Sequence, residues 1–296
     1  MKSPIAYKNG QFIPAEQLSI PVGDAGFVWG ATVTDRVRTF NGQLFRLQDH
    51  LRRFRESCKW SRIPLVESDD QLTELSERLV NHNRGLPDEV VIWIATPGPL
   101  AAFSSFDQGS SRDRPTMIAY SLPINSGRRE RLAKEGARLV TKAAELGVIP
   151  TVKHRSRLPW WIAQKYVHDD DPLAEPLFID LSSGAILETP TSNVLAVVDG
   201  VVRTPPAGEV LEGVSLIVVT ELCRNLGIPF VRDQLTRDEL LVASEIMMAN
   251  TTDCLVGVSS LDQQSVPFAG PVLNRLLDAW SDLVGVNLRE LGGDGR

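Results

Sequence analysis

Lysine is scarce in this sequence, and one lysine occupies a position where its amine could become reactive. Only seven of the 31 basic residues are lysines. Lys153 follows the apolar run Leu146–Val152 and precedes a tryptophan-rich segment, which predicts a strand-to-helix turn at the edge of a pocket. Burial there, or the charges of Arg155 and Arg157, would lower the pKa of the amine and make it a nucleophile. The alternative interpretation is a solvated loop lysine.

A carboxylate that could bind a positively charged group lies later in the chain. Glu188 ends an apolar segment and is followed by the polar loop Thr189–Asn193. A carboxylate at a strand end can point into a cleft and form a charge-assisted hydrogen bond to a protonated heterocyclic nitrogen. A surface glutamate at the corner of a hairpin is the alternative.

Two further segments offer hydrogen-bond donors for an anion. A helix is predicted to open at Gly213, Val214 and Ser215, whose backbone N–H groups would lie at the positive end of the helix dipole. Thr251 and Thr252 follow a predicted strand and add hydroxyl groups. Each signal is weak alone, because a lone glycine at a helix start and an Asn-Thr-Thr turn are both common.

An arginine on another predicted helix could serve the same anion. The helix starts near Asp49 and carries Leu51, Phe54 and Cys58 along one stripe. Arg53 lies beside this buried stripe, where its planar guanidinium could bind a phosphate through two parallel N–H bonds.

The composition favours a small-molecule enzyme. With 296 residues, 43% hydrophobic and 23% charged, the chain can form one large or two smaller cores. A net charge of -6 argues against nucleic-acid binding, which needs a basic surface. The N-terminus has no apolar leader region, and no run of about 18 apolar residues occurs. We therefore expect a cytoplasmic protein that does not enter a membrane.

The cysteines and histidines do not predict a metal site. Cys58, Cys223 and Cys254 are widely spaced in apolar surroundings, which predicts reduced core thiols. The four histidines form no zinc-like cluster, so we propose no metal.

Turn and capping signals predict mixed strands and helices in the first half. The pairs Asn9-Gly10 and Asn41-Gly42 separate short apolar segments and predict two β-hairpins. Ser68 and Gln71 predict a capping box at a second helix. Buried strands are expected at 89–94 and 115–120, so this half should be α/β or α+β.

A stretch of turn-forming residues at 121–127 predicts a linker between two domains. We therefore expect an N-terminal domain at 1–120 and a C-terminal domain at 128–296. In the second domain the patterns predict strands at 138–141, 177–181, 185–188, 193–198, 201–203, 245–249 and 255–259, and helices at 160–168, at 212–226, from 236 and from 271.

The order of these segments resembles one known family more closely than any single segment does. From about Val22 to Asp262 the chain is similar to class IV, or fold-type-IV, pyridoxal-phosphate enzymes, which include branched-chain aminotransferases, D-amino-acid aminotransferases and aminodeoxychorismate lyases. The matching segments are Asp24–Gly30, His50–Ser57, Lys153, Glu188–Val194, Leu211–Ser215 and Met248–Thr252.

The resemblance implies a fold, a cofactor and residue roles. It implies a two-domain α/β (α+β) fold, with a small N-terminal α/β domain and a larger C-terminal pseudo-barrel domain that carries the lysine, and a homodimer. Pyridoxal 5′-phosphate would lie between the domains, as a Schiff base on Lys153, with Glu188 on the pyridine nitrogen. The implied phosphate ligands are Arg53, Gly213, Val214, Ser215, Thr251 and Thr252.

Several positions depart from the family pattern and bear on the substrate. Trp29 replaces a usual tyrosine, and Asp35 replaces a common glutamate. Thr96-Pro97-Gly98 lacks the arginine with which D-amino-acid aminotransferases bind the substrate carboxylate. Arg38 matches an arginine near the substrate pocket of branched-chain enzymes, and with Trp29 and Trp161 it forms the expected substrate group.

The favoured interpretation is an aminotransferase that moves an amino group between an apolar, branched-chain-like α-amino acid and a 2-oxo acid. Lys153 would act as the base, and Glu188 would keep the ring nitrogen protonated. Lys153–Leu158 is closer to the lyase pattern, so elimination of pyruvate from aminodeoxychorismate, which yields 4-aminobenzoate, is the alternative. A non-catalytic cofactor-binding protein is a third interpretation.

Overall fold

The computed structural model describes residues 3–83, 88–103, 114–144 and 149–289, and the chain divides into two units. The first unit comprises Met1–Ile124 and Val152–Arg157, and the second comprises Asn125–Thr151 and Leu158–Arg296. The segment that contains Lys153 thus packs with the first unit, although the sequence assigns this lysine to the C-terminal domain. Residues 146–148 of the apolar run before Lys153 lie outside the described residues.

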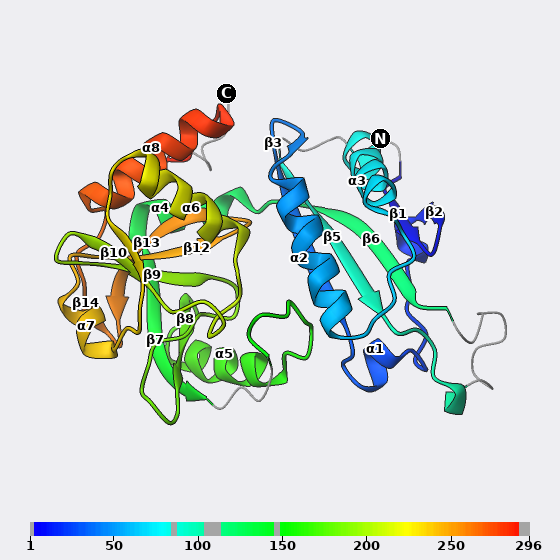
Figure 1. Ribbon diagram of the computed structural model, residues 1–296, viewed down its shortest axis with the longest axis horizontal. Helices are drawn as coiled ribbons and strands as arrows, with labels where there is room; N and C mark the ends of the chain where they lie inside the picture. Colours follow the sequence, from blue (N-terminus) through cyan, green and yellow to red (C-terminus); the bar gives the residue numbers. More distant parts are fainter. Residues whose placement is uncertain (1–2, 84–87, 104–113, 145–148, 290–296) are drawn as a thin grey trace. The chain divides into compact units, whose positions relative to one another are not determined.

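The first unit contains an antiparallel sheet of six strands in the order β2-β1-β6-β5-β3-β4 (Figure 1). Both predicted hairpin turns are confirmed. Asn9 and Gly10 have φ values of 49° and 93°, and Asn41 and Gly42 have 51° and 75°, the positive values that a tight primed turn requires. The strands are β1 Ile5–Lys8, β2 Gln11–Pro14, β3 Val33–Phe40, β4 Gln43–Leu44, β5 Glu89–Thr96 and β6 Thr116–Pro123.

Two long helices of the first unit pack on the sheet. Helix α2, Leu47–Trp60, contacts β3, while α3, Asp69–Asn83, contacts β1, β5 and β6 (Figure 1). The predicted capping box is present at α3, because Ser68 N donates to Gln71 Oε1 at 2.8 Å and Gln71 N donates to Ser68 Oγ at 3.2 Å. The shorter elements are η1 Ala15–Gln17, α1 Ala25–Val28 and η2 Ala101–Phe103.

The apolar stripe of α2 is buried as predicted. Leu51, Phe54 and Cys58 join one core with Val91 and Trp93 of β5. Full burial of side chains of this size stabilises the unit by roughly 1.5–3 kcal/mol each. The core therefore fixes which face of α2 meets β3.

The second unit contains an eight-stranded mixed sheet with the order β11-β10-β9-β12-β13-β7-β8, to which β14 adds by pairing with β13. The chain 185–188 bridges its ends, because Ile186 pairs with Ile179 of β8 and Ile186 N donates to Leu235 O near β11 at 2.7 Å. This closure accords with the expected pseudo-barrel. The strands are β7 Ala137–Ala144, β8 Ala174–Asp180, β9 Asn193–Val198, β10 Val201–Thr204, β11 Phe230–Arg232, β12 Glu245–Asn250, β13 Cys254–Leu261 and β14 Gln264–Ser265.

Five helices pack on this second sheet. They are α4 Ser126–Glu135, α5 Leu158–Asp170, α6 Val214–Asn225, α7 Arg237–Val242 and α8 Pro271–Val284 (Figure 1). The predicted capping box of Thr236 and Glu239 at α7 is confirmed, and so is the start of α8 at Pro271. Leu273, Leu276, Leu277 and Trp280 are buried, as the apolar period of α8 predicts.

The division between the two units, after Ile124, falls inside the predicted linker at 121–127, but most of this segment is regular structure. Its first residues complete β6, and Asn125 caps α4 by accepting a hydrogen bond from Arg128 N at 3.1 Å. Sequence patterns missed α4 because most of its residues are charged and Leu132 is its only buried aliphatic side chain among the described ones. Helix α6 begins at Val214 rather than Glu212, since Gly213 is extended.

The expectation about the cysteines is confirmed. Cys58, Cys223 and Cys254, all within the described ranges, are buried and form no disulfide. Burial raises the pKa of the Cys58 thiol to about 12 and that of Cys223 to about 11, so neither thiol is reactive at neutral pH. Among the described residues, no helix combines the length and apolar character needed to cross a membrane.

The capping box at α7 gives a testable prediction about stability. Thr236→Ala removes the hydroxyl that accepts from Glu239 N, and it should lower the free energy of unfolding by about 1 kcal/mol. Urea denaturation measures this change. Val242→Ala, at an exposed position on the same helix, should change it by less than about 0.5 kcal/mol. Equal effects of the two substitutions would contradict the role of the cap.

Candidate active site

The backbone around Lys153 is fixed against β3 and α2. Thr34 N donates to Lys153 O at 2.9 Å, and Arg155 N donates to Thr32 O at 2.9 Å, so this segment pairs with the start of β3. Lys153 N donates to Ser57 Oγ of α2 at 3.2 Å. The lysine thus occupies the predicted connection between a strand, β7, and a helix, α5, and its main chain is held on two sides.

A buried ionic cluster joins the same two elements. Asp35 of β3 has no exposed surface and accepts from Arg53 Nε at 2.8 Å and from Arg53 Nη2 at 2.7 Å. Its Oδ1 also lies 2.8 Å from His50 Nδ1. His50, Arg53 and Ser57 come from successive turns of α2, so a single helix face carries the cluster and the contact to Lys153.

The protonation of the cluster follows from burial and charge. Burial alone would raise the pKa of Asp35, but the adjacent Arg53 and His50 outweigh it and hold this pKa well below its usual range. For His50, burial is the largest cause of a lowered pKa, with Arg53 and Lys153 acting in the same direction against Asp35. His50 is therefore neutral, and we assign its Nδ1–H as the donor to Asp35.

Arg53 has a partner that the sequence did not predict. The sequence proposes a phosphate ligand, whereas the structure shows a bidentate bond to Asp35. Two parallel bonds fix the plane of the guanidinium group and therefore limit the directions in which its other N–H bonds can point. The phosphate role of Arg53 stays a prediction.

In the second unit, Glu188 meets two neighbouring segments. Its Oε2 accepts from Leu211 N and from Asn193 Nδ2, each at 3.2 Å, and Asn193 Nδ2 also donates to Leu211 O at 2.8 Å. The Glu188 loop and the segment before α6, which are far apart in the sequence, are therefore bound together. The sequence placed Asn193 at the end of the polar loop and the start of a strand, but it did not predict its contacts with Glu188 and Leu211.

Gly213 is required by the close approach of Asn193. A Cβ atom at Gly213 would lie 2.0 Å from Asn193 Oδ1, a distance that no side chain tolerates. Gly213 is the N-cap of α6, and Val214 and Ser215 form the buried first turn. This first turn lies next to the Glu188 loop, as the predicted anion site requires.

The predicted threonine pair also lies beside the Glu188 loop. Strand β12 pairs with β9 up to Ala249 and Asn193, and Asn250 Nδ2 donates to Ser192 Oγ at 3.1 Å. Thr251 and Thr252 follow directly in the turn after β12. The second unit thus brings together three of the predicted segments, namely Glu188, the Gly213 turn and the threonine pair.

The three proposed substrate residues have different surroundings. Arg38 is buried, its Nη2 donates to Asp88 Oδ2 at 3.0 Å, and its guanidinium lies 3.8 Å from the centre of the Phe40 ring. Trp29 and Trp161 are 74% and 58% exposed in the single chain. The charge of Arg38 is thus committed to a carboxylate of its own unit, which weakens its predicted role at a substrate.

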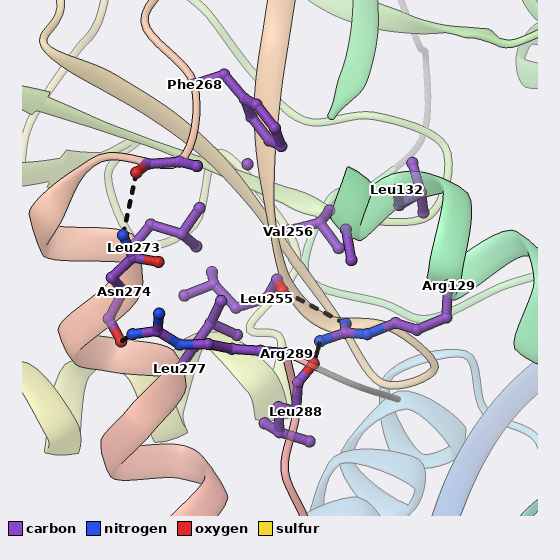
Figure 2. Close-up of a pocket in the computed structure, with 13 residues that line it drawn as sticks. Arg129, Leu132, Leu255, Val256, Phe268, Leu273, Asn274, Leu277, Leu288 and Arg289 are labelled. Carbon is purple, nitrogen blue, oxygen red and sulfur yellow. Dashed lines mark hydrogen bonds between the residues drawn. The ribbon is translucent and has the colours of Figure 1, made fainter. Parts of the chain in front are cut away.

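A cavity of about 130 Å³ lies elsewhere in the second unit, among α4, β13 and α8 (Figure 2). Arg129 reaches across it and donates to Leu288 O at 2.7 Å and to Leu255 O at 3.4 Å, as Figure 2 shows. None of the predicted site residues lines this cavity. It is therefore separate from the candidate active site.

Comparison with known proteins identifies related sequences and folds. A profile of the family described as amino-transferase class IV matches residues 32–261. The D-alanine aminotransferase of Staphylococcus aureus (strain MSSA476) is 26% identical, with 94% of this chain and 97% of the relative covered.

Solved structures share the fold across nearly the whole chain. The branched-chain amino acid aminotransferase of Escherichia coli superposes with a TM-score of 0.85 at 23% identity, covering 96% of this chain and 95% of that one. The branched-chain aminotransferase of the thermophilic archaeon Thermoproteus uzoniensis, solved with norvaline, has a TM-score of 0.84 at 20% identity and the same two coverages. A third branched-chain amino acid aminotransferase, complexed with N-(5′-phosphopyridoxyl)-L-glutamate, has a TM-score of 0.81 at 22% identity.

The buried cluster gives a prediction with a defined pH dependence. Asp35→Asn leaves the Arg53 charge buried without its carboxylate, so the free energy of unfolding at neutral pH should fall by about 3 kcal/mol or more. Because the pKa of Asp35 is lowered on folding, its stabilisation is complete above the unfolded value of about 3.9 and declines as the pH falls below it.

Urea denaturation at several pH values measures both effects. Asp49→Asn, which weakens the more exposed pairs of this carboxylate with Arg46 and Arg52, should cost less than about 1 kcal/mol. A difference between wild type and Asp35→Asn that grows toward acid pH would contradict the assignment.

Proposed function

The chain belongs to the class IV aminotransferase family and is a transaminase; we propose that it transfers the amino group of an apolar L-α-amino acid to a 2-oxo acid. Class IV aminotransferases use pyridoxal 5′-phosphate. The observation that most directly supports a role for Lys153 is that its main chain is held in place. Thr34 N donates to Lys153 O, and Lys153 N donates to Ser57 Oγ. A fixed main chain limits where the amine can move, as a positioned nucleophile requires.

The side chains of this protein fit the chemical groups of that cofactor. Lys153 offers an amine for the aldehyde, and Glu188 offers a carboxylate for the protonated ring nitrogen. The first turn of α6, with Gly213 as its N-cap, suits a phosphate because helix N-termini bind anions. The proposed phosphate ligands are Arg53, Gly213, Val214, Ser215, Thr251 and Thr252.

Each residue then has a defined task. The cofactor, when bound, supplies an electron sink that lowers the barrier to breaking the Cα–H bond. The Nζ of Lys153 would remove the proton from the substrate Cα and pass it to the cofactor carbon that receives the amino group. Glu188 keeps a negative charge beside the ring nitrogen, and Leu211 N and Asn193 Nδ2 hold that carboxylate in place.

The relatives and the sequence differ in the amino donor that they favour. The curated relative named above is a D-alanine aminotransferase, whereas Thr96–Gly98 lacks the arginine expected for that subgroup. The neighbouring folds are branched-chain enzymes, but they are under 25% identical. We propose L-leucine-like substrates, a homodimer and a cytoplasmic location, with D-alanine as the main alternative donor.

A substrate scan tests the reaction and the donor together. L-leucine, L-valine and D-alanine are added one at a time to the protein loaded with cofactor, and absorbance reports conversion to the amine form. We expect an apolar L-amino acid to convert the cofactor and a 2-oxo acid to reverse it. Conversion by D-alanine alone would contradict the donor. Release of pyruvate from aminodeoxychorismate without any conversion would favour the lyase, to which Lys153–Leu158 is similar.

Covalent mapping tests the lysine. Borohydride reduction of the loaded protein, followed by peptide mass spectrometry, should place the adduct on Lys153. Lys142 and Lys165 are internal controls, since they flank the same region of sequence. An adduct on either of them would show that Lys153 is not the attachment site.

Substitution of the carboxylate tests its electronic role. Glu188→Gln keeps the shape but loses the charge, so it should retain cofactor and slow both half-reactions by on the order of 100-fold. Glu130→Gln, on the exposed side of α4, should leave both rates unchanged. If Glu188→Gln reacted at the wild-type rate, the carboxylate would have no part in the chemistry.

A further inference from the structure

The strand pairing determines on which face of the first sheet the Lys153 side chain lies. The bonds from Thr34 N to Lys153 O and from Arg155 N to Thr32 O place Val33 opposite His154 and Thr34 opposite Lys153. Residues directly opposite in an antiparallel pair project on the same side of the sheet. Lys153 and Thr34 therefore share a face.

The other face of this strand pair is the core of the unit. Val33 and Val37 of β3 and the neighbouring Val152 all belong to the hydrophobic core that α2 and α3 cover. Because side chains alternate along a strand, Lys153 lies on the opposite face from these residues. Arg36, two residues beyond Thr34, lies on that face with Lys153.

The residues next to Arg36 make this face partly apolar. Arg36 is paired with Ile92 of β5, and Ile92 is paired with Tyr120 of β6. In the adjacent row, Thr34 is paired with Ile94. An arginine, two isoleucines and a tyrosine thus share one face of the sheet with the lysine. Arg36, Ile94 and Tyr120 are half-buried on this face, whereas Ile92 is buried.

We propose that Arg36 binds the α-carboxylate of the substrate, with the half-buried Ile94 contacting its apolar side chain; this assignment rests on the proposed transamination at Lys153. Arg36 stands diagonally across from Lys153, a separation of about 7–8 Å that long side chains can span. The amino nitrogen and the carboxylate of an α-amino acid are one carbon apart, so one substrate can contact both residues.

Arg38 is the less suitable arginine for this role. It lies one row further from Lys153, is 3% exposed, and is bound to Asp88 and stacked on Phe40. A carboxylate substrate would have to displace Asp88 from a buried ion pair, which is strongly unfavourable because the displaced charge would be left without its partner. Arg36 is nearer to Lys153 and more exposed than Arg38, and its backbone N–H donates to Asp35 Oδ1 at 2.7 Å, which links its position to the buried cluster.

The proposed contacts impose a chemical requirement on the substrate. A bidentate bond from Arg36 requires a carboxylate on the carbon that bears the amino group, and an apolar surface beside it favours an uncharged side chain. Amines without a carboxylate should therefore be poor substrates. This requirement holds for either hand of amino acid.

The test compares two ligands of nearly the same shape, one a carboxylate and the other a neutral amide. Holoenzyme is titrated calorimetrically with 4-methylpentanoate and with its amide, and the half-reaction with the best amino acid is followed by absorbance. Arg36→Gln should weaken acid binding and lower kcat/KM by about 100-fold, while amide binding stays unchanged. Arg36→Lys should recover part of the loss, because it keeps the charge but not the fork.

A matched control is Arg52→Gln, which removes an exposed arginine from α2 and should leave the affinity for both ligands unchanged. Equal loss of acid and amide binding in Arg36→Gln would mean a structural role and would overturn the proposal, as would unchanged kcat/KM. If Arg36→Gln does not fold, Arg36→Lys is the test. A loss of affinity for the acid alone supports the proposal, whereas a loss for the acid that equals the loss for the amide refutes it. Failure of wild type to convert any amino acid would instead refute the transaminase assignment, and the binding comparison would still test Arg36.

Discussion

The buried ion pair between Asp35 and Arg53 is the constraint on which the rest of the first unit depends. A charged pair without solvent is tolerated only if both partners stay ionised and their hydrogen bonds are made, and here His50 completes the set. The pair binds β3 to α2 at one register. The same register brings Ser57 to Lys153 and sets Arg36 on the face that the lysine shares. A single electrostatic contact therefore helps to position three residues with proposed roles, namely Lys153, Arg53 and Arg36.

In the second unit, one neutral amide side chain holds two of the proposed site segments together. Asn193 contacts Glu188 and Leu211 at once, and its Oδ1 excludes any side chain at Gly213. The carboxylate and the start of α6 are thus fixed relative to each other by one amide. In each unit the loop that carries a proposed site residue is tied by hydrogen bonds to a neighbouring strand or helix, which limits its motion.

Local signals in the sequence predicted most elements, because their causes are local. The Asn-Gly turns and the capping boxes at Ser68 and Thr236 depend on residues at most three positions apart. The partners of Arg53 and Arg38 could not be predicted this way, since Asp35 and Asp88 are 18 and 50 residues distant and many acids compete for each arginine. Helix α4 was missed for another reason, as its charged face gives almost no apolar period. The packing of Lys153 with the first unit also depends on long-range pairing, which a strand-to-helix pattern does not reveal.

The most direct measurement is a crystal structure of the protein with its cofactor bound. We expect continuous density from Lys153 Nζ to the cofactor, with the phosphate contacting Arg53 while Asp35 still accepts both of its bonds from that arginine. Attachment at another lysine, or an Arg53 that leaves Asp35 to reach the phosphate, would contradict the view that the buried pair positions the site.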